Sequence, residues 1–522
     1  MIRKETTMRR RISILAAALV TAFDAHADVR LPAVFSDHMV LQRDAEVPVW
    51  GWAEPGEKVV VTLAGQRAEA TADAGGAWRA KLGRLAAGGP HALKVEGKNT
   101  VEIQDVLIGE VWLASGQSNM AMTVNRARDF EKECAASNLP QIRMFTTART
   151  PAREPAKDCK GSWAICSPET VGGFSATAYF FAREIHRALG VPVGILNSSV
   201  GGTPIEAWTS LDACKLKAEL KPVLESWASR AATYDPVKAK AAHEKQLAAF
   251  AERAKRTKAD GKKPPRRPKA PMNPRDDTHY PGNLFNGMIA PLVPYAIRGA
   301  IWYQGENNTR GETAAFYDVL LDALIGDWRA RWDGKAPGPK AGAGFPFAWV
   351  QLPNFNAPPD RDWPAVREGM RRALAIPDTG MAITLDIGDP SNIHPTNKQE
   401  VGHRLALWAM AKAYGKNIAY SGPLLRSHEI RGNEIRLIFD HAEGLKADGE
   451  PAGFEVRAAD GSWHKAIAKI DGDAVVVSSP DVTAPTAARY ACSNNPAAPL
   501  SNATGIPASP FTTGIPALAR DQ

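Results

Sequence analysis

The hydrophobic pattern of the chain changes character twice. Over residues 28–105, short apolar stretches such as Val59-Val-Val-Thr-Leu63 alternate with turns rich in Gly, Asp and Pro. The same alternation returns over residues 419–522, for example in Ala474-Val-Val-Val-Ser478. Short apolar runs bounded by turn residues are typical of antiparallel strands. The pattern therefore predicts an N-terminal β domain and a C-terminal β domain.

Between residues 106 and 418 the pattern is that of strands alternating with helices. The predicted strands are Val111 to Ala114, Val193 to Leu196, Gly299 to Tyr303, Phe347 to Leu352 and Met381 to Leu385. The predicted helices are Ala178 to Leu189, Ala314 to Trp332, Ala365 to Ala375 and Asn397 to Tyr414. Such alternation implies a parallel sheet covered by helices on both faces, which is the α/β fold class. A chain of 522 residues has room for this domain and both β domains.

The region 211–275 departs from the alternation. It contains an Ala/Lys/Glu-rich helical stretch interrupted by Pro222 and Pro236, which indicates an insertion. Nine Lys and Arg residues lie between Arg253 and Lys269 against one acid, so this segment accounts for the whole formal charge of +8. The remainder is balanced, which argues against a nucleic-acid-binding face. We interpret Lys262 to Lys269 as a solvated loop rather than a patch for polyanions.

The first residues have the features of a secretory signal. Arg9-Arg10-Arg11 precede the apolar run Ile12 to Phe23, and Ala25-His26-Ala27 supplies small residues before a cleavage site at Asp28; Met8 is an alternative start. A membrane anchor is the competing interpretation, but spanning a bilayer takes roughly 20 apolar residues. We therefore predict a signal peptide over 1–27 and a secreted or periplasmic protein without a membrane span after cleavage.

Cysteine usage points to disulfides rather than to a metal. The five cysteines are Cys134, Cys159, Cys166, Cys214 and Cys492, and an odd number leaves at least one unpaired within the chain. Cys159 and Cys166 flank a short loop and form the predicted pair. Because their spacing fits no zinc site, we predict no metal and no cofactor.

A serine follows the first apolar strand of the α/β region. In Glu110-Val-Trp-Leu-Ala-Ser-Gly-Gln-Ser-Asn-Met120 the apolar run ends in small and amide residues around Ser118. Open α/β sheets place their chemistry just past strand ends, so Ser118 is the candidate nucleophile. By itself the segment fits a helix-capping serine equally well.

Two later strand ends also carry polar groups. Gly201-Gly202 follows the strand that starts at Val193, and paired glycines let a backbone N–H approach a ligand closely, although a tight turn would use them too. Ile301-Trp-Tyr-Gln-Gly-Glu-Asn-Asn308 places the Gln304 amide and the Glu306 carboxyl at the next strand end, where Glu306 could orient its neighbours.

A fourth strand end carries a histidine. In Asp386-Ile-Gly-Asp-Pro-Ser-Asn-Ile-His-Pro395 the residue His394 precedes a helix, at whose start Thr396 and Gln399 have the spacing of a capping box. The helix start anchors the loop, so His394 is the candidate base.

The order Ser, Gly, Gln, His along one α/β domain resembles the SGNH (GDSL-like) hydrolases, and more specifically the sialate O-acetylesterase family. The resemblance extends over almost the whole chain after residue 27 through three further segments: Leu31-Pro-Ala-Val-Phe-Ser-Asp-His-Met-Val-Leu-Gln-Arg43, Asn286-Gly-Met-Ile-Ala-Pro291 and Gly505-Ile-Pro-Ala-Ser-Pro-Phe511. It implies that Ser118 is the nucleophile and His394 the base. It also implies an oxyanion hole formed by the Ser118 and Gly202 N–H groups and the Gln304 side chain.

One position departs from the family pattern. Where many relatives carry an acid before Ile-His-Pro, this chain has Ser391 and Asn392. Asp389 is the predicted orienting acid; Asp386 lies nearby, and Asn392 or a backbone carbonyl could hold the imidazole instead, leaving a Ser-His dyad. Since the third member mainly fixes the tautomer and orientation of the histidine, its replacement need not abolish activity.

The resemblance implies a carbohydrate O-acetylesterase that works through an acetyl-serine intermediate. Its substrate would be O-acetylated sialic acid or an acetylated hemicellulose such as xylan or xyloglucan. Trp112, Trp208 and Trp302 either stack on sugars or belong to the core. A carbohydrate-binding protein with a decayed site is the alternative of another class, and Asn392 is the only feature that favours it.

Overall fold

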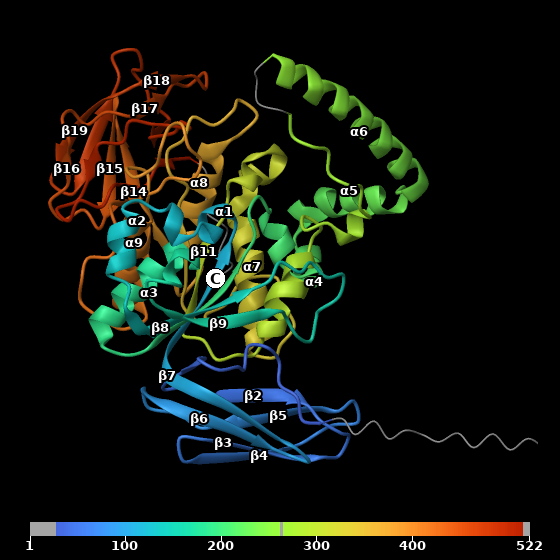
Figure 1. Ribbon diagram of the computed structural model, residues 1–522. Helices are drawn as coiled ribbons and strands as arrows, with labels where there is room; N and C mark the ends of the chain where they lie inside the picture. The colour runs from blue at the N-terminus through green and yellow to red at the C-terminus, as the bar shows by residue number, and fades with distance from the viewer. Residues whose placement is uncertain (1–27, 261–264, 515–522) are drawn as a thin grey trace, which may run out of the picture.

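The computed structural model describes residues 28–260 and 265–514. The predicted signal segment 1–27 lies outside the described residues, as do Lys262 and Lys263 of the basic run. Three regions follow one another along the chain (Figure 1): a β region at the N-terminal end, a sheet covered by helices, and a second β region at the C-terminal end.

The N-terminal region consists of antiparallel strands around a buried apolar face. In β5 every second residue is buried, as expected for a strand with one face in a core. Its strands pair β2 with β5, β3 with β4 and β6, and β6 with β7. They are β1 (Val40–Gln42), β2 (Val47–Trp52), β3 (Lys58–Leu63), β4 (Gln66–Thr71), β5 (Ala77–Leu82) and β6 (Gly88–Glu96).

One long strand, β7 (Thr100–Gly116), belongs to both this region and the central sheet. Its first half pairs with β6, and from Glu110 onward it pairs in parallel with the central strands. The sequence predicted a strand only over Val111 to Ala114, where the apolar run lies. In the structure, residues 106–116 are buried without interruption, whereas residues 100–105 alternate between exposed and less exposed positions. The boundary predicted between residues 105 and 106 falls inside this strand.

The central sheet has the order β13-β12-β11-β7-β10-β8-β9. Neighbouring strands are parallel except for β8 and β9, which form an antiparallel edge. This confirms the predicted α/β fold and adds one antiparallel strand to it. The strands are β8 (Leu139–Thr147), β9 (Gly161–Cys166), β10 (Val193–Ser199), β11 (Gly299–Tyr303), β12 (Phe347–Val350) and β13 (Thr379–Ala382).

Helices cover both faces of this sheet (Figure 1). Trp112 and Ala114 on one face of β7 pack in a cluster with residues of α3 (Ala176–Leu189) and α9 (Lys398–Lys412). Leu113, on the other face, belongs to the cluster that contains residues of α7 and α8. The remaining helices of the central region are α1 (Ser118–Ala121), α2 (Phe130–Ala135), α7 (Tyr317–Trp332) and α8 (Trp363–Arg372), with a 3-10 turn, η9 (Gly311–Phe316), before α7.

The start of α9 differs from the prediction by one residue. The cap is Asn397, whose Oδ1 accepts from the Glu400 N–H at 3.3 Å, rather than Thr396. Gln399 does not close a capping box, since its side chain instead donates to the carbonyl of Arg128 at 2.7 Å. The turn before the helix is thereby tied to the segment that follows α1.

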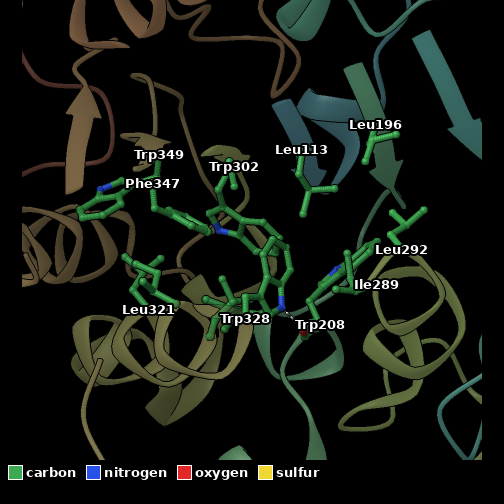
Figure 2. Close-up of a cluster of buried hydrophobic side chains, with 14 of the residues drawn as sticks. Leu113, Leu196, Trp208, Ile289, Leu292, Trp302, Leu321, Trp328, Phe347 and Trp349 are labelled. Carbon is green, nitrogen blue, oxygen red and sulfur yellow. Dashed lines mark hydrogen bonds between the residues drawn. The ribbon is translucent and has the colours of Figure 1, made fainter. Parts of the chain in front are cut away.

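The tryptophans near the strand ends form part of the core (Figure 2). Trp112, Trp208 and Trp302 are fully buried, so none of them presents a surface on which a sugar could stack. The ring of Trp302 packs edge-on between Trp208, at 6.2 Å, and Trp328, at 5.9 Å. Of the two interpretations left open by the sequence, the structure supports packing.

Most of the insertion forms a helical arm that extends from the body (Figure 1). The arm contains α5 (Lys221–Ala232) and α6 (Pro236–Ala259), whereas α4 (Leu211–Lys215), at the start of the insertion, packs against α7 (Tyr317–Trp332) in the body. Pro222 and Pro236 do not interrupt a helix but stand in the first turn of α5 and α6, where a missing N–H costs nothing. No residue of α6 is buried, which agrees with its polar sequence.

The C-terminal region contains two four-stranded sheets, β14-β15-β20-β19 and β18-β17-β21-β23. Arg367 of α8 is fully buried and donates to the carbonyls of Leu352 and Pro353 in the central region and of Ser493 and Asn494 in the C-terminal region, which joins the two. The strands are β14 (Leu424–Arg431), β15 (Glu434–Asp440), β16 (Lys446–Ala447), β17 (Phe454–Arg457), β18 (Trp463–Lys465), β19 (Ile467–Asp471), β20 (Ala474–Ser478), β21 (Ala487–Tyr490), β22 (Leu500–Ser501) and β23 (Phe511–Thr512).

All five cysteines are free thiols, so the predicted pair Cys159 and Cys166 is not formed. The physical reason is the strand between them. β9 runs from Gly161 to Cys166, and six extended residues span roughly 20 Å, whereas the Cα atoms of a disulfide lie about 5.5 Å apart. The sequence showed a short separation but not its extended conformation.

Gly116 at the end of β7 leaves no room for a side chain. A Cβ there would lie 2.2 Å from the carbonyl oxygen of Tyr303, and φ is +138°. For Gly116→Ala we expect a loss of about 3 kcal/mol or more in the apparent free energy of unfolding, because a backbone clash and an unfavourable φ add. Urea unfolding followed by tryptophan fluorescence measures it.

Gly190→Ala is the matched control. Gly190 also has a positive φ, +65°, but a Cβ there meets nothing within 4 Å. The expected loss is only about 1 kcal/mol, from the backbone conformation alone. Equal losses in the two variants would contradict the importance of the contact between Gly116 and Tyr303.

Candidate active site

The carboxyl-terminal ends of three strands, β7, β10 and β11, meet at one edge of the central sheet. Gly116 of β7 lies opposite Ser199 of β10 and Tyr303 of β11. Ser118 follows two residues after β7, as the first residue of α1, and its side chain is half-buried. A Cβ on Gly201 would lie 3.3 Å from the Ser118 Cβ, so the paired glycines pass directly beside the predicted nucleophile.

The two backbone N–H groups predicted for the oxyanion hole are those of Ser118 and Gly202. Ser118 is the first residue of a helix, where backbone N–H groups have no partner within the helix. Gly202 is exposed and has a φ of +77°. Within residues 28–260 and 265–514 no acceptor binds the Gly202 N–H. Both predicted donors are therefore free to bind a ligand oxygen.

The Gln304 amide is already engaged within the protein. Its Nε2 donates to the Thr203 carbonyl at 3.1 Å and to Asn308 Oδ1 at 2.7 Å, and its Oε1 accepts from the Tyr317 hydroxyl at 2.6 Å. Gln304 is also fully buried. Since an amide nitrogen carries two hydrogens, donation to an oxyanion would require breaking one of these bonds. The predicted role of Gln304 stays a prediction.

Asn307, three residues later, is better exposed. Its side chain is half-buried, and its Nδ2 donates to the Gly202 carbonyl at 2.6 Å. Its backbone N–H donates to Gln117 Oε1 at 3.2 Å. One amide hydrogen remains, beside Gly202, whose N–H has no acceptor in the described chain. Asn307 was part of the third sequence segment, but nothing in the sequence distinguished it from Gln304.

Asn119 ties the nucleophile to the histidine loop. Its fully buried amide donates to Glu306 Oε1 at 2.5 Å and to the Ile393 carbonyl at 3.0 Å, and it accepts from Lys398 Nζ at 2.6 Å. Because Asn119 adjoins Ser118 and Ile393 adjoins His394, these bonds bring the two predicted catalytic residues to one place. Glu306 thus orients a neighbour of the nucleophile. No hydrogen bond joins the Ser118 hydroxyl to the His394 ring in the described chain, as in many ligand-free sites.

The charges around Asn119 are buried. Burial raises the pKa of Glu306, although the hydrogen bond from Asn119 opposes the shift. Burial lowers the pKa of Lys398 to about 7, against the attraction of Glu306, and its ammonium lies 5.1 Å from the centre of the Tyr303 ring. Sequence reasoning missed both Asn119 and Lys398. Lys398 carries no signal, because a lysine in the first turn of a helix is normally exposed.

No carboxylate contacts the His394 ring within the described residues. Asp389 accepts from the N–H and hydroxyl of Ser391, both at 2.8 Å, and these bonds lower its pKa. Asp386 instead pairs with Arg404 through both carboxylate oxygens. Asn392 Oδ1 accepts from the backbone N–H of His394 at 3.0 Å, so this side chain shapes the loop without touching the imidazole.

Two basic side chains, Lys398 and Arg126, act on the His394 ring instead. Its pKa is lowered, first by partial burial and then by the nearby charges of Lys398 and Arg126. A lowered pKa keeps the imidazole neutral near pH 7, as a general base requires. In residues 28–260 and 265–514, no group of three or more His, Cys, Asp and Glu side chains is placed to hold a metal ion. No helix of this part of the chain is long and apolar enough to cross a membrane.

Comparison with known proteins agrees with the geometry. Residues 108–234 match the family model described as carbohydrate esterase, sialic acid-specific acetylesterase. The sialate O-acetylesterase of Rattus norvegicus is 30% identical over 459 residues, which cover 79% of this chain and 79% of the relative. The Homo sapiens sialate O-acetylesterase is 30% identical over 447 residues, covering 77% of this chain and 74% of the relative. The chain belongs to the sialate O-acetylesterase family.

A solved structure extends the likeness to the whole fold. A carbohydrate acetylesterase from Xanthomonas citri is 37% identical, with a TM-score of 0.77, and the match covers 93% of this chain and 99% of that one. The family membership confirms the prediction of a carbohydrate O-acetylesterase, which is an ester hydrolase. The likeness also confirms an SGNH-like fold.

The cations near His394 predict how the activity responds to pH. The predicted base, His394, works when neutral, so we expect turnover to fall as the pH drops through the His394 pKa, which lies below the ordinary value for histidine. Arg126→Gln removes one exposed cation and should raise this pKa, moving the acid limb of the kcat/KM profile to higher pH. Initial rates on an aryl acetate between about pH 4 and pH 9 measure the limb.

Arg128→Gln is the control for this experiment. Arg128 is exposed on the same loop, but its side chain pairs with Asp129 and does not act on His394. Its acid limb should coincide with that of the wild type. A limb that is unmoved in Arg126→Gln, or moved equally in both variants, would contradict the electrostatic assignment.

Proposed function

We propose that the chain hydrolyses acetyl esters of sugars through an acetyl-serine formed on Ser118. The observation that carries the proposal is the Asn119 network, which places Ser118 and the His394 loop side by side at the edge of the sheet where Gly202 presents its free N–H. A nucleophile, a neutral base and unpaired N–H donors are the parts that acyl transfer needs.

The reaction proceeds in two halves. His394 takes the proton of the Ser118 hydroxyl as its oxygen attacks the acetyl carbonyl carbon, and the tetrahedral intermediate collapses when the imidazolium returns the proton to the departing sugar oxygen. Water then attacks the acetyl-serine while His394 accepts one of its protons, and that proton returns to Ser118 as acetate leaves. No cofactor takes part.

The oxyanion of each intermediate is bound by the N–H groups of Ser118 and Gly202 together with one side-chain amide. We assign the amide to Asn307 in place of Gln304, because Asn307 adjoins Gly202, is half-exposed and has one hydrogen to spare. Gln304 instead stabilises the residues around Gly202, because its amide donates to the Thr203 carbonyl and to Asn308 Oδ1.

The orientation of His394 follows from its loop rather than from an acid. Asn392 binds its backbone N–H, and Asn119 holds the carbonyl of the preceding residue, Ile393. We therefore propose a Ser-His dyad, with Asp389 stabilising the turn through Ser391.

We expect substitution of Asn307 to affect turnover and substitution of Gln304 to affect stability. Asn307→Ala should lower kcat by roughly 10²–10³-fold, the usual cost of removing an oxyanion donor, with little change in unfolding. Gln304→Ala should lower the free energy of unfolding by about 2 kcal/mol or more, because it leaves buried partners unpaired. Steady-state kinetics and urea unfolding of both variants decide between them. Loss of turnover in Gln304→Ala at unchanged stability would restore Gln304 as the donor.

The proposed substrate class comes from the relatives, and the proposed location comes from the predicted signal segment. The curated relatives are named for sialate, and the solved structural relative is called a carbohydrate acetylesterase. We propose O-acetylated sialic acid as the first substrate, with acetylated xylan or xyloglucan as the alternative. The predicted signal peptide favours a secreted or periplasmic enzyme that meets such glycans outside the cytoplasm.

Acetate release tests the substrate and the mechanism together. The panel consists of O-acetylated sialic acid, acetylxylan and acetylated pectin, each with wild type and Ser118→Ala. The wild type should release acetate from at least one of them, and Ser118→Ala should be slower by roughly 10⁴-fold or more. Binding of these glycans without acetate release would instead support a non-catalytic carbohydrate-binding protein. Equal rates in both proteins would rule out Ser118 as the nucleophile.

A further inference from the structure

A second histidine, outside every segment that the sequence singled out, contacts the oxyanion glycine. His279 lies after the basic insertion, in a turn between the short 3-10 segment η5 (Pro274–Asp276) and the helical segment η6 (Phe285–Ile289). Its Nε2 lies 2.8 Å from the Gly202 carbonyl oxygen, and its Nδ1 lies 2.9 Å from Asp277 Oδ1. We infer that His279 is a positioning residue that, as an imidazolium held by Asp277, fixes the Gly202 carbonyl and so restricts the backbone of the glycine that offers the N–H.

The charge of the ring follows from its partners. A neutral imidazole donates from one nitrogen only, and its other nitrogen needs a donor. Here Nε2 faces a carbonyl, which has no hydrogen to give, and Nδ1 faces the Asp277 carboxylate, with the Thr278 hydroxyl farther away at 3.3 Å. Only the protonated ring can make both hydrogen bonds. The Asp277 carboxylate, which also accepts from the His279 backbone N–H at 2.9 Å, supplies the counter-charge.

Gly202 needs such support because it has no side chain to hold it and its N–H has no acceptor in the described chain. Gly201 and Gly202 are both exposed, and a glycine explores more backbone conformations than any other residue. On the N-terminal side the loop is attached by the Val200 N–H, which donates to the Gly116 carbonyl at 3.0 Å. Past the glycines, the Gly202 carbonyl is held by His279 and by Asn307. The Gly202 carbonyl belongs to the peptide unit after the Gly202 Cα and the Gly202 N–H to the unit before it, so two donors on the carbonyl restrict the backbone rotations of Gly202 that connect the two units.

The turn that carries His279 is itself anchored. Asn283 Nδ2 donates to the carbonyls of Arg275 and Asp277, both at 2.8 Å, and the Gly282 N–H donates to the Glu206 carbonyl at 3.0 Å. A buried residue next to His279, Thr278, accepts a hydrogen bond from Arg149. His279 is thus presented to Gly202 from a fixed frame.

The surrounding charges act on the ring from several elements. Asp277 raises the pKa of His279 through its hydrogen bond, against partial burial and the charge of Lys269. The buried carboxyl of Glu206 also interacts with His279, and Arg230 of α5 interacts with Asp277. The His279 hydrogen bond correspondingly lowers the pKa of Asp277. Geometry and charge favour the same protonation state.

This arrangement sets an alkaline limit on activity, given the proposed role of Gly202. Because the pKa of His279 is raised, the ring makes both hydrogen bonds, to Asp277 and to the Gly202 carbonyl, at low pH. It loses one of them as the pH rises through the His279 pKa. His394 has the opposite shift and sets the acid limit. One histidine must be neutral and the other charged, so the pH range of full activity lies between the two pKa values.

The protonation state can be measured without catalysis. In Ser118→Ala labelled on histidine, NMR titration of the His279 ring should give a pKa above the ordinary value of about 6.5. Asp277→Asn, which keeps the size of the side chain and removes its charge, should lower it. A His279 pKa at or below that of free histidine would overturn the inference.

Kinetics tests the positioning. In Asp277→Asn the alkaline limb of kcat should move to lower pH. In His279→Gln, whose neutral amide still donates to the Gly202 carbonyl, the limb assigned to His279 should disappear. In His279→Ala kcat should fall by about tenfold at pH 6 with KM little changed, because a misplaced oxyanion donor costs less than the roughly 10²-fold loss of a missing one.

Asp276→Asn is the matched control. Asp276 directly precedes Asp277 but pairs with Arg153 on the surface. The alkaline limb of kcat in Asp276→Asn should therefore match that of the wild type. A limb unmoved in Asp277→Asn would overturn the inference, and would point to Lys398 as the group that titrates. Wild-type turnover in Ser118→Ala would instead overturn the proposed function, and with it the kinetic part of the inference, while the NMR result would stand.

Discussion

The architecture depends on a buried carboxylate at the middle of β7. Glu110 is fully buried at the point where the strand leaves the N-terminal region and enters the central sheet. It accepts hydrogen bonds from Arg43, Gln42 and Arg298, and these outweigh the cost of burial and lower its pKa. Arg43 follows β1 and Arg298 precedes β11, so one carboxylate joins three segments distant in sequence. A buried charge left without its partners typically costs about 3–5 kcal/mol. The direction of β7, and hence the place where Ser118 emerges, depends on this junction.

From that fixed strand end, the site is assembled by amides rather than by charges. Asn119 joins the nucleophile turn to the histidine loop, and Asn307 and Gln304 hold the two sides of the glycine turn. An amide both donates and accepts, so a single side chain can connect two loops without the desolvation penalty of an ion. The ionisable groups behind the amides, Glu306 and Lys398, have pKa values shifted toward their neutral forms. The two ionisable side chains that contact Asn119 therefore carry less charge than they would in water.

The sequence predicted what depends on periodicity and on order along the chain. Continuous apolar runs identified β10 and β11 to within three residues, and the strand ends located Ser118, Gly202 and His394. It could not reveal contacts between distant segments. Nothing local distinguishes Asn307 from Gln304, because the difference lies in which of them is already bonded to Thr203 and Asn308. The short separation of Cys159 and Cys166 in the sequence predicts a disulfide, but the extended strand between them keeps the two thiols apart. His279 lacked a motif altogether, since its partner Gly202 is brought to it only by folding.

The proposed Ser-His dyad is best understood from what Asn392 does. Its Oδ1 caps the backbone of His394, a bond that an aspartate at this position would also make, so the loop keeps its shape when the charge is removed. What changes is the electrostatics of the imidazole. An acid would raise the pKa of His394 and stabilise the imidazolium that forms during attack. Here Lys398 and Arg126 lower that pKa instead. The proposed base thereby stays neutral down to lower pH, without a carboxylate to stabilise its protonated form. In the proposed Ser-His dyad, asparagine at position 392 therefore changes the electrostatics of the imidazole but leaves the bond that shapes its loop in place.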